Sequence, residues 1–438
     1  MRDDNAAALD SHGFEVPTQL LSKYNAIQQQ SSQSGAVAAG AALSWPALLE
    51  QAAAKGYRAG GPLPPRFVTA VRDGVPDEHR STAWLLLSGA AQKRDEHPGL
   101  YATLLATGRE RSQDVQVEEQ IDRDLHRTFP GHPALTEAFC QRIKNVLLAY
   151  SARNPEVAYC QGMNFVTAAI LMFVHEEDSA FWLLSHVVED VLIDHYVQSM
   201  LGHQVDSQVL EQLLEQQLPH IASHLRSLSL SVPFVTTQWF LCLFLNALPS
   251  ETCFRVWDLI FCLHPCTIFQ VSIALFGSME EQSLLETTDV GPAVFVIRSA
   301  ARSCFDASRL FALAQERFHE VTVRRVEAMR EKWRQTTMEV LHAKLRVREL
   351  QVVQDTVQDT FGHHQARSLL LALRLDGFCA HRAIRHNELT DMLKGYLPEK
   401  ECGVLLQFIL ASSPEPGSGS SASAPPPLSP DGGPTSVG

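Results

Sequence analysis

Two short segments of the chain offer an arginine and a glutamine that could act together on a phosphate group. Arg127 lies in the segment from Ile121 to Pro130, and Gln161 lies in the segment from Tyr159 to Asn164. In the hydrolysis of GTP by small GTPases, an arginine can neutralise charge in the transition state and a glutamine can orient the attacking water. The two residues therefore suggest phosphoryl-transfer chemistry, provided that the fold brings them together.

The arginine segment has the spacing of a side chain held by its own carboxylate. Asp124 and Arg127 are three residues apart, so on a helix they are neighbours and the acid can fix the orientation of the guanidinium. Pro130 ends or prevents helix just beyond them. On spacing alone, an ordinary surface ion pair contributing about 0 to 1 kcal/mol is the commoner explanation.

The glutamine segment is predicted to be a turn between two helices. Asn154 and Pro155 end one helix, and the apolar run from Phe165 to Phe173 belongs to the next, so Gln161 and Gly162 fall between them. Glycine allows the backbone to approach a partner closely, and an amide can donate and accept hydrogen bonds at once. An isolated glutamine here would more often be a capping or loop amide.

Both segments resemble the two catalytic motifs of the TBC family, a helical domain that activates GTP hydrolysis by Rab-type small GTPases. The resemblance rests on Ile121, Asp124, Arg127, Thr128, Phe129 and Pro130 in the first segment and on Tyr159, Gln161, Gly162, Met163 and Asn164 in the second. It implies that Arg127 and Gln161 are the catalytic fingers and that Asp124, Tyr159, Gly162 and Asn164 support them. We expect Tyr159 and Met163 to pack rather than react.

Further segments resemble the family in the expected order. Arg72 to Pro76 is similar to its opening motif, and the resemblance implies a structural, buttressing role for Arg80 and Trp84 behind the active face. Downstream similarities include Phe181-Trp182, Leu218-Pro219, Trp239-Phe240 and Arg255 to Asp258. Residues 150–206 and 239–258 are most similar to the short growth-hormone-regulated TBC group, whereas the connection 131–137 is shorter than in many relatives.

The predicted fold is all-α, with a multi-helix TBC domain, additional C-terminal helices and a disordered tail. Apolar residues recur at helical spacing from Arg66 to about Arg317, without the alternation typical of strands. We expect an N-terminal extension at 1–60 containing a low-complexity linker at 28–43, a TBC domain at 61–317 and a helical region at 318–411. Residues 412–438 are rich in Ser, Pro and Gly and are predicted to be disordered.

Three expectations concern the flanking regions. Gly13-Phe14-Glu15 resembles a segment that precedes the domain in many TBC proteins, and a short lead-in helix is predicted from Trp45 to Ala54. One long helix is predicted from Glu316 to about Gln354, with Arg324, Arg325, Arg330, Lys332 and Arg334 on solvated faces.

Composition limits the partners and the location of the protein. The net charge of −13 argues against general nucleic-acid binding. The longest apolar stretches are too short to span a bilayer, no secretory signal is visible, and the nine scattered cysteines are expected to be reduced and buried. We expect a cytoplasmic protein that associates peripherally with endomembranes through its partners.

No cofactor or metal is expected in the chain itself. A phosphate-binding Gly-Lys-Ser/Thr loop is absent, so GTP and Mg²⁺ should be bound by the partner GTPase. Cys262 and Cys266 lack a second ligand pair at zinc spacing. The calcium-loop interpretation near Asp376-Gly377 fails at its ligand positions, and no Gly-x-Ser-x-Gly elbow indicates a hydrolase.

The leading hypothesis is a GTPase-activating protein that binds a GTP-loaded Rab and supplies Arg127 and Gln161 in trans, thereby regulating vesicle trafficking. No independent enzymatic activity is expected. The main alternative is a Rab-binding scaffold with weak or no catalysis, and a helical-repeat adaptor is disfavoured because the sequence lacks self-similar repeats.

Overall fold

The computed structural model describes residues 8–35, 44–111, 116–279 and 283–344. The chain divides into two units, Met1–Val340 and Leu341–Gly438, and nearly all of the described residues belong to the first. The predicted tail at 412–438, the calcium-loop segment near Asp376 and most of the predicted helical region at 318–411 lie outside the described residues.

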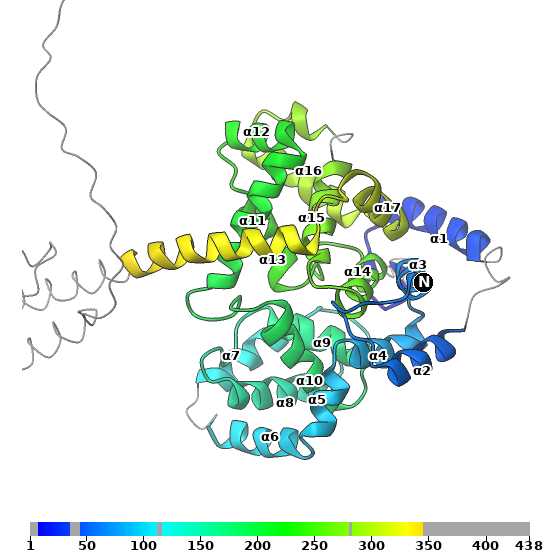
Figure 1. The fold of residues 1–438 in the computed structure, drawn as a ribbon, viewed down its shortest axis with the longest axis vertical. Helices are drawn as coiled ribbons and strands as arrows, with labels where there is room; N and C mark the ends of the chain where they lie inside the picture. The colour runs from blue at the N-terminus through cyan, green and yellow to red at the C-terminus, as the bar shows by residue number, and fades with distance from the viewer. Residues whose placement is uncertain (1–7, 36–43, 112–115, 280–282, 345–438) are drawn as a thin grey trace, which may run out of the picture. The chain divides into compact units, whose positions relative to one another are not determined.

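The described residues of the first unit are mainly helical, as the apolar periodicity predicted (Figure 1). The N-terminal helices are α1 (Leu21–Gly35), α2 (Trp45–Lys55), α3 (Pro65–Asp73), α4 (Asp77–Leu87), α5 (Ala90–Glu96), α6 (Leu100–Arg111), α7 (Gln116–Leu125), α8 (Glu137–Arg153) and α9 (Met163–Phe173). The later ones are α10 (Glu177–His186), α11 (Leu201–Gln217), α12 (Pro219–Ser227), α13 (Val232–Leu241), α14 (Ser250–Cys262), α15 (Thr267–Ser278), α16 (Val290–Arg302) and α17 (Ala307–Arg317). Shorter turns are η1 (Thr18–Leu20), the π-helical η2 (Val187–Val191) and η3 (Leu284–Glu286).

The helices form two groups that α14 connects. In Figure 1, α5 to α10 lie in the lower half of the picture and α11, α12, α15 and α16 in the upper half. Helix α14 packs against α4, which contacts α5, α9 and α10, and also against α15, which contacts α11 and α16. Its apolar face carries Phe254, Trp257 and Phe261, which are fully buried, so the core continues through α14 from one group to the other.

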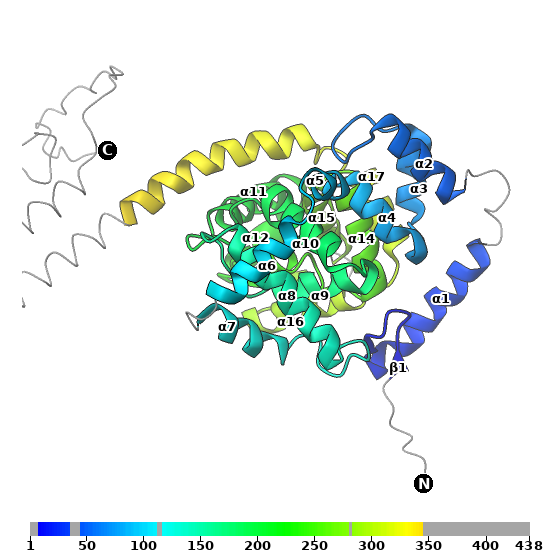
Figure 2. The same ribbon diagram turned by 90° about the horizontal axis from the view of Figure 1, so that it is seen from below.

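The N-terminal extension is more ordered than the sequence indicated. Strands β1 (Ala8–Leu9) and β2 (Glu15–Val16) pair antiparallel as a short hairpin, and α1 follows it along one edge of the unit (Figure 2). Residues 28–35 belong to α1, so the first half of the predicted linker at 28–43 is helical, and residues 36–43 lie outside the described residues. The lead-in helix is confirmed as α2.

The predicted continuous helix from Glu316 is also wrong, because the chain breaks after α17. Residues 318–322 are not helical, and a further helix runs from residue 323 to the end of the described range at 344. Phe318 is buried at the break and Val326 is buried in the new helix. The predicted domain boundary at 317 therefore falls inside the unit that extends to Val340.

Arg330 of this last helix is not solvated as expected. Its Nε and Nη2 each donate to a carboxylate oxygen of Asp206, both at 2.7 Å, and Asp206 is 2% exposed. Burial opposes ionisation of Asp206, but the Arg330 charge and a contact with His195 outweigh it and lower the pKa of Asp206 to about 2. An ion pair thus attaches the helix to α11.

Candidate active site

Arg127 stands in a tight turn directly after α7, with its guanidinium held by a buried carboxylate. Its Nε lies 2.9 Å and its Nη2 2.6 Å from Oδ1 of Asp124. The arginine side chain is 55% exposed and the aspartate side chain only 4%. The cation therefore faces solvent while its partner is anchored inside the protein, as the three-residue spacing predicted.

The second oxygen of Asp124 connects the turn that carries Arg127, residues 126–131 and here called the arginine turn, to the glutamine segment. The hydroxyl of Tyr159 donates to Asp124 Oδ2 at 2.6 Å. Burial and this hydrogen bond raise the pKa of Tyr159 far above its ordinary value, so the phenol remains a donor. The expectation that Tyr159 mainly packs was incomplete, because its hydroxyl also fixes the carboxylate that holds Arg127.

A second buried link joins the same two segments. Asn164, at the start of α9, donates through Nδ2 to Thr128 Oγ1 at 2.7 Å, and Thr128 donates in turn to the Asp124 carbonyl at 2.7 Å. Asn164 Oδ1 accepts from the backbone N–H of Gly162 at 3.0 Å. Asn164 thus contacts both turns. Sequence reasoning gave Thr128 no role, and only its place in the motif pointed to it.

Gln161 occupies the turn before α9, as predicted, and is exposed. Its side chain makes no hydrogen bond among the described residues. Its neighbour Gly162 has φ +114°, a conformation that other residues rarely adopt, and a Cβ there would lie 3.1 Å from the Leu241 carbonyl oxygen. That carbonyl also accepts from the Tyr196 hydroxyl at 2.7 Å, so the turn rests against a fixed backbone.

Arg80 and Trp84 share a fully buried carboxylate and both contact Phe173 at the end of α9. Arg80 Nε lies 3.1 Å from Asp258 Oδ1, Trp84 Nε1 donates to the same oxygen at 2.8 Å, and the Val75 N–H lies 3.3 Å from Oδ2. Burial raises the pKa of Asp258 to about 6 although Arg80 opposes it. The expected structural role fits these contacts, but the sequence did not reveal Asp258 as the shared acceptor.

Other features of the described residues concern their thiols, their metal-ligating groups and the lengths of their helices. The described cysteines are free, and Cys262 and Cys266 are buried. Within the described ranges, no group of three or more His, Cys, Asp or Glu is arranged to hold a metal ion. None of the helices in these ranges combines the length and the apolar character needed to span a membrane.

Comparison with known proteins places the chain in a family. The Rab-GTPase-TBC domain model matches residues 77–285. Growth hormone-regulated TBC protein 1-A of Danio rerio is 31% identical over 291 residues, covering 64% of this chain and 76% of the relative. Growth hormone-regulated TBC protein 1 of Mus musculus is 31% identical over 306 residues, covering 64% of this chain and 81% of the relative.

A solved structure agrees with these matches. The crystal structure of the Chlamydomonas flagellar RabGAP TBC domain is similar with a TM-score of 0.57 and 27% identity, covering 70% of this chain and 99% of that domain. The chain belongs to the TBC family of Rab GTPase-activating proteins. Membership implies a Rab-type GTPase as its partner, and the resemblance drawn from the two motifs is confirmed at the level of the family.

Proposed function

We propose that the protein accelerates GTP hydrolysis by a Rab-type GTPase, to which it supplies Arg127 and Gln161. One observation carries the proposal: two exposed polar side chains stand on turns that buried hydrogen bonds join, from Tyr159 to Asp124 and from Asn164 to Thr128. Such an arrangement fixes the relative position of the two turns while leaving their side chains available to a partner.

Arg127 would stabilise charge that develops on the transferring phosphoryl group. Its exposed guanidinium is oriented before the partner arrives, because Asp124 accepts from it and is itself fixed by Tyr159. A group that is already oriented needs little rearrangement during the reaction. Arginine fingers contribute about 10³- to 10⁵-fold to the rate of GTP hydrolysis.

Gln161 would orient the attacking water. Its amide oxygen can accept from the water while its amide nitrogen donates to a phosphate oxygen. The water attacks the γ-phosphorus, and the bond from that phosphorus to the β–γ bridging oxygen breaks. The nucleotide and its Mg²⁺ belong to the GTP-bound partner under this proposal, and the protein would act at endomembranes in vesicle trafficking because its partner is located there.

The test is single-turnover GTP hydrolysis across a panel of Rab GTPases. Wild type should accelerate at least one Rab, and Arg127→Ala and Gln161→Ala should each lose most of the acceleration. Arg123→Ala is the matched control, because Arg123 is an exposed arginine of α7, four residues before Arg127, whose Nε donates to the Glu119 carbonyl.

Two outcomes would overturn the proposal. Acceleration of no Rab by wild type excludes catalysis, and equal activity of wild type and both variants excludes these residues as the source. Binding that depends on GTP without faster hydrolysis would instead support a Rab-binding scaffold.

A further inference from the structure

The N-terminal hairpin is built as a fixed turn. Asp10 Oδ1 accepts from the backbone N–H groups of His12 at 3.0 Å and Phe14 at 2.9 Å, and Gly13 between them has φ +92°. Asp10 Oδ2 accepts from the Ser250 hydroxyl at 2.6 Å, at the start of α14. The hairpin is therefore attached to the domain by its own turn, although residues 8–16 lie outside the match to the family, which begins at residue 77.

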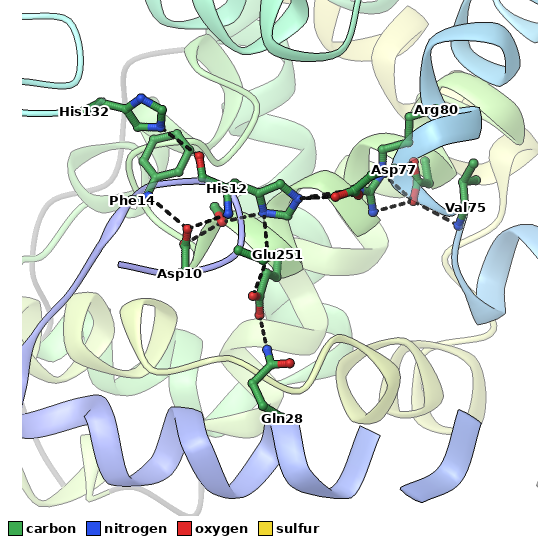
Figure 3. Close-up of polar contacts among 12 residues, drawn as sticks. Asp10, His12, Phe14, Gln28, Val75, Asp77, Arg80, His132 and Glu251 are labelled. Carbon is green, nitrogen blue, oxygen red and sulfur yellow. Dashed lines mark hydrogen bonds and ion pairs between the residues drawn. The ribbon is translucent and has the colours of Figure 1, made fainter. Parts of the chain in front are cut away.

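His12 inserts its ring among groups of the domain core. The ring packs edge-on against Phe254 at a centroid distance of 4.8 Å and against Phe173 at 5.7 Å. Its Nδ1 lies 3.0 Å from Ser250 Oγ, and its Nε2 lies 3.2 Å from a carboxylate oxygen of Asp77, which pairs with Arg80 (Figure 3). The turn of the hairpin thus contacts the polar network that Arg80 forms with Asp77 and Asp258.

On its other side the hairpin touches the arginine turn. His132 Nε2 donates to the His12 carbonyl at 2.9 Å, as Figure 3 shows, and the Ala134 N–H donates to His132 Nδ1 at 3.2 Å. The Phe14 ring packs edge-on against His132 at 4.5 Å and against Phe129 at 4.9 Å. The connection from the arginine turn to α8 is therefore fixed by contacts with the hairpin.

Phe129 is the critical contact because its backbone is strained. It lies two residues after Arg127 and has φ +42°, a conformation that residues other than glycine adopt only when their surroundings impose it. Its ring is packed between Phe14 at 4.9 Å and Phe165 of α9 at 5.2 Å. Removing the Phe14 ring would take away one of these two supports.

The geometry points to the N-terminal hairpin, residues 8–16, as a positioning element for Arg127, acting through Phe14 and the contact of His12 with His132. This inference rests on the proposed function and extends it to a segment outside the matched domain. Phe14 is a positioning residue, because its ring supports the turn that carries Arg127.

The experiment compares full-length wild type with Phe14→Ala, Phe14→Leu and the control Leu9→Ala, a hairpin side chain that is 48% exposed. Phe14→Ala should lower the maximal single-turnover rate by about 10- to 100-fold, since small misplacement of a catalytic group has effects of that size. Phe14→Leu should lose less and Leu9→Ala nothing. The concentration of protein needed for half-maximal acceleration should stay unchanged.

The same substitution made in the Arg127→Ala variant separates positioning of Arg127 from general damage to the fold. In the Arg127→Ala protein, Phe14→Ala should slow hydrolysis no further, because the group that it positions is gone. An additional loss of the same size in that background would overturn the inference.

Hydrogen exchange of the free protein keeps the inference testable if no Rab responds. Phe14→Ala should speed amide exchange in residues 126–134 and leave α11 unchanged. Acceleration of no Rab by wild type would defeat the proposed function alone, whereas unchanged exchange at 126–134 in Phe14→Ala would defeat the positioning role.

Discussion

The arginine turn and the glutamine turn hold their side chains in opposite ways. Arg127 is fixed by side chains, since Asp124 accepts from its guanidinium and Tyr159 fixes Asp124. Gln161 has no such partner among the described residues, and only the backbone around it is fixed, through Gly162. The arginine is therefore oriented in the free protein, whereas the glutamine would acquire its orientation from the partner.

The two turns also achieve positive φ differently. Phe129 follows Arg127 at φ +42° and depends on packing by Phe14 and Phe165, whereas Gly162 follows Gln161 at φ +114° and needs no such help. Changes near Arg127 should thus act through neighbouring side chains. Changes near Gln161 should act through the backbone.

The largest expected effect concerns the two fingers themselves. Arg127→Ala should reduce the maximal single-turnover rate by about 10³- to 10⁵-fold, and Gln161→Ala by about 10²- to 10³-fold, as for loss of one orienting donor. The arginine supplies a charge that nothing else among the two turns replaces, whereas the glutamine supplies only orientation. A larger loss of rate for Gln161→Ala than for Arg127→Ala would contradict this ranking of the two residues.

The next effect tests whether side chains hold the arginine. Asp124→Asn should lower the rate by about 10- to 100-fold, because a hydrogen-bonded charge partner of Arg127 is lost. Tyr159→Phe should lower it less, since the carboxylate remains. The measurement is the single-turnover rate of both variants, with circular dichroism to confirm that they fold. A wild-type rate for Asp124→Asn would show that Arg127 does not need the Asp124 carboxylate to be oriented.

A third prediction tests the backbone support of the glutamine. Gly162→Ala should lower the free energy of unfolding by about 1 to 3 kcal/mol, because a Cβ would meet the Leu241 carbonyl in a strained conformation. Gly99→Ala is the control, since Gly99 has φ +78° with no atom within 4 Å of its Cβ position. Urea unfolding should show the smaller loss for Gly99→Ala, and equal losses would mean that the close approach is unimportant.

The last prediction concerns a contact beside this backbone support, and its effect on stability depends on pH. Tyr196, whose hydroxyl binds the Leu241 carbonyl, follows His195, which contacts Asp206 at 3.2 Å. The pKa of Asp206 is lowered to about 2 from an unfolded value of about 3.9. Its stabilisation, on the order of 2 kcal/mol, is therefore complete above about pH 4 and is lost as the pH falls toward 2.

Urea unfolding of wild type and Asp206→Asn at several pH values measures this contribution. The difference in unfolding free energy should be constant from pH 7 to about 4 and narrow below it. Asp194→Asn serves as the comparison, because Asp194 is the carboxylate that pairs with Arg334, another arginine of the last helix. A difference independent of pH would show that the Asp206 carboxylate charge contributes nothing.

The sequence was informative where structure is local. Helical periodicity predicted α8 and its end at Asn154, and the spacing of Asp124 and Arg127 predicted their contact. It was uninformative where distant residues meet: Asp258 accepts from Arg80 across 178 positions, and no pattern in either segment encodes that pairing. The sequence did not predict the hairpin for a related reason. Strands of two residues are too short to show an alternating pattern, and contacts with distant parts of the domain stabilise them.

Asp258 has a consequence for how the protein is made. Arg80 in α4 is 4% exposed, and its guanidinium pairs with the Asp258 carboxylate in α14. During synthesis this buried acceptor is missing until α14 has left the ribosome. The polar groups of the first helices can therefore be buried only after α14 has been synthesised. Premature stops before residue 258 should consequently yield chains that chaperones and proteases treat as unfinished.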